Sequence, residues 1–97
     1  MDNKQIELFY KIKHRMDEIE GCEKKLGFFG EINNMFAIDQ IIRVTFDFEA
    51  GNSYTLSGDD IARLQFDLAD NIIFYKNRIK VLENNLDELK QLMIKLI

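Results

Sequence analysis

The pattern of hydrophobic and polar positions begins with a segment that has the spacing of one helical face. Between positions 2 and 26, apolar residues recur at three- and four-residue steps: Phe9, Ile12, Met16, Ile19 and Leu26. Asp2 and Gln5 have the spacing of a capping box at the start. Gly27 follows two lysines at the other end, as a residue that terminates a helix does. We therefore expect a helix over about 2–26.

The next segment, 27–37, mixes aromatic residues with residues that break regular structure. Phe28, Phe29 and Phe36 stand beside Gly30 and a pair of asparagines. This composition favours a buried connection, with a short strand near Phe28 as the alternative.

The segment of about 38–57 has the alternation of a β-hairpin. Polar residues separate four apolar positions: Ile42, Val44, Phe46 and Phe48. A three-residue turn at 50–52 would set Phe48 opposite Tyr54 and Phe46 opposite Leu56, so that the apolar faces coincide. The pattern thus predicts a hairpin with one buried face.

The last segment, about 58–96, is predicted to be one long helix. Glycine and proline are absent after Gly58, and Ser57 has capping-box spacing with Asp60. Apolar residues then follow a seven-residue repeat for more than four heptads, which is the pattern of a coiled coil. The residues expected to make the intersubunit contact are Leu68, Ile72, Tyr75, Ile79, Leu82, Leu86, Leu89, Met93 and Leu96.

The expected lengths of the two helices differ, and this difference predicts self-association. A helix of about 38 residues spans roughly 57 Å, whereas the first helix reaches only about 37 Å. The segment from Leu82 onward would then expose an apolar stripe, which marks an association surface. We expect a homo-oligomer, most simply a dimer.

Together these elements predict an α+β fold in a single domain, 1–97: helix, antiparallel β-hairpin and long helix. The C-terminal helix is expected to form an intersubunit coiled coil or helical bundle. The core is expected between the hairpin and the two helices, from seven phenylalanines: Phe28, Phe29, Phe36, Phe46, Phe48, Phe66 and Phe74.

Composition limits the partners. The formal net charge is −4, which argues against direct nucleic-acid binding, because such binding needs clustered lysines and arginines. The N-terminal residues lack the apolar region of a signal peptide, and no apolar run is long enough to span a membrane. The single cysteine is consistent with a reducing compartment. A cytoplasmic protein with no membrane partner is expected.

No residue pattern predicts catalysis, a metal site or a cofactor. The chain has one histidine, His14, and one cysteine, Cys22, so neither a Cys–His pair with further ligands nor a zinc module fits. The carboxylates lie opposite the apolar helix faces, as on a solvated surface. Alternatively, they could imitate a phosphate backbone in a basic channel.

Two groups of residues are candidates for a ligand or partner surface. The outer face of the hairpin carries Ile41, Arg43, Thr45 and Thr55. Tyr54, Arg63 and Arg78 are of the types that stack on a nucleotide or hold its phosphates by paired hydrogen bonds. Ordinary surface decoration is the competing interpretation.

In size, acidity and composition the chain resembles the small phage-encoded counter-defence proteins, which include inhibitors of CRISPR effectors and sponges for cyclic nucleotide signals. This resemblance covers no defined motif and assigns no residue. It implies a small, acidic, non-enzymatic homo-oligomer in the bacterial cytoplasm, which inhibits a protein or sequesters a small nucleotide. The alternatives are a structural adaptor that assembles a larger complex through its coiled coil, and an enzyme whose site forms between subunits.

Overall fold

The order of elements is the predicted one. The computed structural model describes residues 2–38 and 40–97; residues 1 and 39, which the expected domain and hairpin ranges include, lie outside the described residues. Helix α1 (Asn3–Ile38) is followed by strands β1 (Arg43–Asp47) and β2 (Ser53–Ser57) and by helix α2 (Asp59–Leu96). The two strands pair antiparallel.

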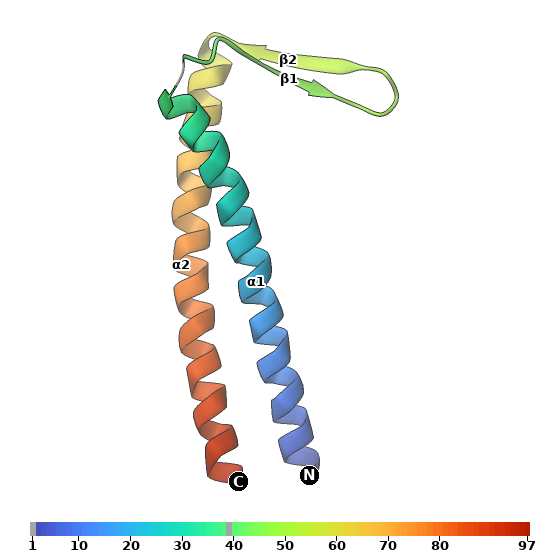
Figure 1. The fold of residues 1–97 in the computed structure, drawn as a ribbon, viewed down its shortest axis with the longest axis vertical. Coiled ribbons are helices and arrows are strands. Elements are labelled where there is room, and N and C mark those ends of the chain that lie inside the picture. Colours follow the sequence, from blue (N-terminus) through green and yellow to red (C-terminus); the bar gives the residue numbers. More distant parts are fainter. Residues whose placement is uncertain (1, 39) are drawn as a thin grey trace.

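The two helices form an antiparallel rod with the chain ends together at one end and the hairpin at the other (Figure 1). The principal extents are 58 × 31 × 17 Å. At the terminal end, the side-chain amide of Gln5 donates a hydrogen bond to the carbonyl oxygen of Leu96 over 3.0 Å. Asp2 and Gln5 also form the predicted capping box, with reciprocal bonds of 3.1 and 2.9 Å. No described helix is long and apolar enough to cross a membrane.

Helix α1 is longer than expected, and the predicted connection over 27–37 is wrong. The helix continues through Gly27 and Gly30 to Ile38. Each glycine costs a helix interior about 1 kcal/mol relative to alanine. Packing on α2 offsets this cost: the ring of Phe29 stacks on that of Tyr75 with centroids 5.8 Å apart, and Phe36 is half-buried.

The prediction that the second helix is much longer than the first is therefore wrong. α1 has 36 residues and α2 has 38, so the two helices match. Leu82 and Leu86, in the segment expected to overhang, are buried in the rod. Self-association remains a prediction, but it needs a different basis.

The contact between the helices follows a heptad seam on both sides. On α2 it uses the predicted repeat. On α1 the buried and half-buried side chains alternate in steps of three and four, and they include Leu8, Ile12, Arg15, Ile19, Cys22, Leu26, Phe29 and Phe36. The predicted α1 face is only partly right: Phe9 and Met16 are about half exposed.

The hairpin has the expected strands in a different register. Phe46 faces Tyr54 and Val44 faces Leu56. The turn is three residues long, as predicted, but it lies at 49–51: the amide of Phe48 donates to the carbonyl of Asn52, and the amide of Gly51 to that of Phe48, both over 2.9 Å. Gly51 has φ 89°, which suits glycine at this turn position. The pairing shifts by two residues, so the same side chains still share a face.

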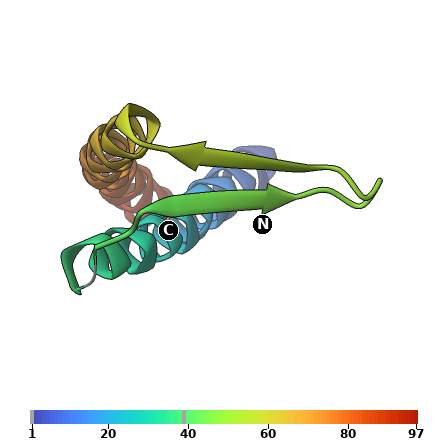
Figure 2. The same ribbon diagram turned by 90° about the horizontal axis from the view of Figure 1, so that it is seen from above.

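The predicted core between hairpin and helices is wrong. The hairpin projects sideways from the end of the rod, and its turn points away from both helices (Figures 1 and 2). Five of the seven phenylalanines expected there are exposed: Phe28, Phe46, Phe48, Phe66 and Phe74. Among the described residues the buried side chains are instead those of the rod: Leu8, Ile61, Leu68, Leu82 and Leu86.

The start of α2 also differs from expectation. The residue before the first turn is Gly58, with φ 60°, and no side chain caps the helix. The predicted cap by Ser57 is therefore wrong, whereas Asp59 and Asp60 do occupy the first turn.

Candidate protein-interaction surfaces

The hairpin presents one uncharged apolar face to solvent. Because strand residues alternate between faces, six side chains share this side: Ile42, Val44, Phe46, Phe48, Tyr54 and Leu56. We call these six residues the apolar arm face. Phe46 is 45%, Phe48 58% and Tyr54 60% exposed. An isolated two-stranded hairpin is marginally stable in water, so a face of this kind indicates a missing partner layer.

The opposite face of the hairpin is polar and carries several of the residues predicted for a ligand or partner surface. Arg43, Thr45 and Thr55 are exposed there. The hydroxyl oxygens of Thr45 and Thr55 are 3.0 Å apart and share a hydrogen bond. Tyr54 lies on the apolar arm face instead, which separates it from these three residues.

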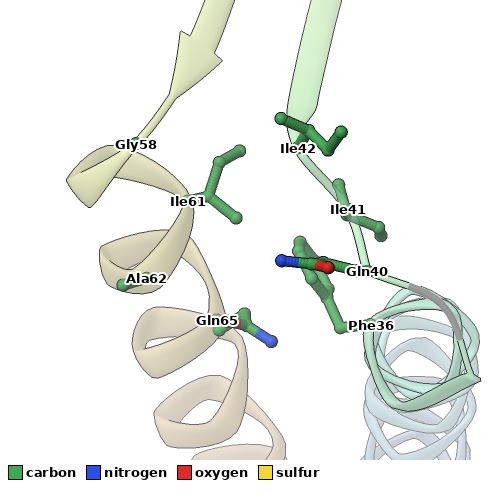
Figure 3. A pocket seen from close by; sticks show the side chains of 8 residues that line it. All are labelled: Phe36, Gln40, Ile41, Ile42, Gly58, Ile61, Ala62 and Gln65. Carbon is green, nitrogen blue, oxygen red and sulfur yellow. The ribbon is translucent and has the colours of Figure 1, made fainter.

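A groove of about 400 Å³ lies at the base of the hairpin, between the ends of the two helices. In Figure 3, Ile61 of α2 stands on one side, and Phe36, Ile41 and Ile42 stand on the other. The remaining lining residues that the structure describes are Gln40, Gly58, Ala62 and Gln65, and none of these is charged. Ile42 belongs both to the groove and to the apolar arm face, which makes the two one continuous surface.

The two arginines predicted for phosphate contacts, Arg63 and Arg78, are not brought together in one chain. Arg43 is on β1 and Arg63 is exposed on α2. Arg63 and Arg78 are fifteen positions apart, which is about 22 Å along a helix. Arg78 is also engaged within the rod: its guanidinium lies 3.4 Å from a carboxylate oxygen of Glu18.

Glu18 is the centre of a polar cluster in the middle of the rod. Besides Arg78, it accepts a hydrogen bond from Arg15, and the His14 ring nitrogen is 3.2 Å from it. Arg15 in turn donates to the side-chain oxygen of Asn85 over 2.6 Å. Polar contacts inside a helix seam fix the alignment of the two helices. We therefore assign this cluster a structural role.

An aromatic row crosses the rod nearer to the hairpin. Phe28, Phe29, Tyr75 and Phe74 follow one another with ring centroids 5.7, 5.8 and 5.2 Å apart. The Lys25 ammonium lies 5.4 Å from the centre of the Tyr75 ring, within the range of a cation–π contact. Within this row, the stacked pair of Phe29 and Tyr75 joins α1 to α2.

The residues predicted to join two subunits face α1 of their own chain. Leu68, Leu82 and Leu86 are buried, and Leu96 is exposed at the terminal end. The others are half-buried: Ile72, Tyr75, Ile79, Leu89 and Met93. A contact of this seam with a second chain stays a prediction.

Helix α2 also carries a second apolar stripe, which lies outside the seam that faces α1. Ala62, Phe66, Ala69 and Ile73 recur at steps of four, three and four, and all four are exposed. Lys76 and Lys80 continue the stripe toward the chain ends, so it is short. The terminal end of the rod exposes a further apolar group: Ile6, Phe9, Tyr10, Ile94, Leu96 and Ile97.

The strand alternation indicates the apolar arm face, but this face is predicted from the sequence to be buried; of the groove residues, Phe36 is predicted in the core and Ile41 on the outer face of the hairpin. The described residues contain no group of three or more potential metal ligands. No protein-family model matches the chain, and no curated protein or solved structure is significantly similar to it.

Proposed function

We propose that the chain is a non-enzymatic adaptor that associates with copies of itself and links other proteins into a larger complex. The observation that carries this proposal is the amount of surface that one copy leaves exposed. A compact monomer of 11.5 kDa exposes about 5,800 Å² by the usual scaling of area with mass. This chain exposes 7806 Å².

The excess is of the size that stable complexes bury. The excess is about 2,000 Å² per chain, or about 4,000 Å² for two chains. Obligate interfaces bury about 2,000 to 5,000 Å² in total, counted over both partners. Much of the exposed surface is apolar and aromatic, as in the apolar arm face, the α2 stripe and the terminal end. In a self-associated complex, a second copy of the same chain buries this surface, and no other protein is needed.

The adaptor is favoured over the sequestration of a nucleotide by the arrangement of the cationic residues. Arg63 and Arg78 are about 22 Å apart along α2, Arg78 contacts Glu18, and none of the described residues that line the groove is charged. A phosphate-bearing ligand needs converging donors. The rod instead separates two apolar ends along its 58 Å extent, which suits a spacer between two attachment points.

The experiment is thermal unfolding of the chain over a hundredfold range of its concentration, with and without cyclic nucleotides. Coupling of folding to association makes the melting temperature rise with concentration. We expect that rise, and no further rise with nucleotide. A melting temperature independent of concentration contradicts the proposal. Stabilisation by a nucleotide would favour sequestration instead.

A further inference from the structure

We infer that the hairpin is the arm through which two copies associate, with the apolar arm face of each copy packed against that of the other. This inference rests on the proposed function and specifies its contact surface. The partner is a second copy of this chain, related by a two-fold axis.

The hairpin needs a partner for its own stability. β1 and β2 pair with each other, and within the described residues no third strand extends their sheet. Three strands, or a layer packed on the apolar face, are needed for a hairpin to be stable. Neither strand carries a lysine or a proline, and Arg43 and Asp47 of β1 are the charged residues that protect the sheet edges from pairing. The arm is therefore a surface that stays unstable until something covers it.

A second copy fits this surface by its charge and its symmetry. None of the six side chains of the apolar arm face is charged, so two such faces meet without like-charge repulsion, although each chain has a net charge of −4. A two-fold contact uses the same patch on both subunits. A uniformly apolar patch is complementary to itself.

The area determines how the arms are arranged. A large apolar side chain that is half exposed offers about 100 Å², from the 150–250 Å² that aromatic residues bury. The four most exposed residues, Ile42, Phe46, Phe48 and Tyr54, then give about 800 Å² for two chains. Stable interfaces bury about 1,200 Å² or more, so the arm faces must also cover the adjoining groove.

Arms that point in opposite directions achieve this. The distance from Ile42 at the base to Phe48 at the tip is about 20 Å at about 3.4 Å per residue. When the two arms overlap over this length, Phe48 of each copy lies over the groove of the other. Pockets of about 300 to 1,000 Å³ hold drug-sized molecules, so the groove has room for a phenylalanine side chain.

The test is sedimentation equilibrium of the intact chain and of two matched double variants. Phe46→Asp with Phe48→Asp places two charges on the arm, and Phe66→Asp with Ile73→Asp places two on the exposed stripe of α2. We expect a dimer for the intact chain and for the stripe variant, and a mass of 11.5 kDa for the arm variant. Retained helical circular dichroism shows that the arm variant is folded, since the arm is outside the rod core.

The outcomes separate the two proposals. A monomeric intact chain overturns the proposed function and this inference together. A dimeric arm variant, or a monomeric stripe variant, overturns the inference and leaves self-association standing.

Cross-linking tests whether the two arms of the dimer point in opposite directions, and it does not depend on a loss of stability. In a Cys22→Ser background, one chain carries Glu49→Cys at the arm tip and the other carries Gln65→Cys in the groove. A short bismaleimide should join tip to groove in the mixture. Joining of tip to tip in the Glu49→Cys chain alone would show arms pointing the same way and contradict the arrangement.

Discussion

Leu82→Ala is the substitution that tests most sharply whether α1 covers the C-terminal half of α2. Leu82 is 3% exposed, and it lies on α2 between Arg78 and Asn85, which contact Glu18 and Arg15 of α1. Burying a leucine side chain contributes about 1.5–3 kcal/mol, and the cavity left by truncation raises the loss to about 2–5 kcal/mol. Because the seam has one helix on each side and can partly collapse, we expect about 3 kcal/mol.

The matched control is Leu92→Ala on the same helix. Leu92 is 49% exposed, so its truncation leaves no cavity and should cost about 1 kcal/mol. Helix propensity changes equally in both variants. The assay is urea unfolding followed by circular dichroism at 222 nm, at one fixed protein concentration, because association shifts the apparent stability. Equal losses for the two variants would refute the packing of α1 on this part of α2.

Four further substitutions test local features by the same unfolding assay. Gly21 lies in the exposed middle of α1 with open space around it, so Gly21→Ala should stabilise the chain by about 0.5–1 kcal/mol. Gly58 has φ 60°, so Gly58→Ala should destabilise the chain by about 1 kcal/mol. Changes of the same sign for both variants would contradict the backbone conformations of the two glycines. Asp2→Ala removes the capping box of α1 and should cost about 1 kcal/mol, and no loss would mean that this end of the helix is frayed. Glu18→Gln breaks the ion pairs of the polar cluster and should cost about 1 kcal/mol, with a smaller loss at about 1 M salt, where charges are screened within about 3 Å. A salt-independent loss would show that hydrogen bonding alone matters there.

The sequence predicted best where one local signal acted alone. The long helix has no glycine or proline after Gly58 and a sustained heptad repeat, and α2 covers the predicted range. The capping box of Asp2 and Gln5 is a contact within one turn, and it forms as predicted. Strand alternation identified which hairpin residues share a face, although a one-residue shift of the turn changed the register by two.

The failures come from packing between distant segments. Gly27 has the position of a helix-ending residue, but Phe29 and Phe36 gain contacts on α2 that keep the helix intact. The predicted seam of α1 is wrong at Phe9 and Met16, because Leu8 and Arg15 occupy the seam positions instead, and Arg15 donates a hydrogen bond to Asn85 where apolar contact is expected.

The core prediction for the hairpin phenylalanines is wrong for a related reason. The predicted core assumes that the helices of the same chain cover the apolar strand face. The alternation of apolar and polar residues along a strand shows that one face is apolar, but it does not show what covers that face. Phe46 and Phe48 were therefore assigned to the core.

Hydrogen exchange of the hairpin amides tests the central claim most directly, that the arm is held by a second copy. Amides in a hairpin that opens freely exchange almost as fast as in an unfolded chain, because local opening costs little free energy. In the intact chain at a concentration where it associates, we predict protection of β1 and β2 amides that falls on dilution, while the rod stays protected. Rapid exchange of the strand amides at every concentration, beside a protected rod, would contradict the account.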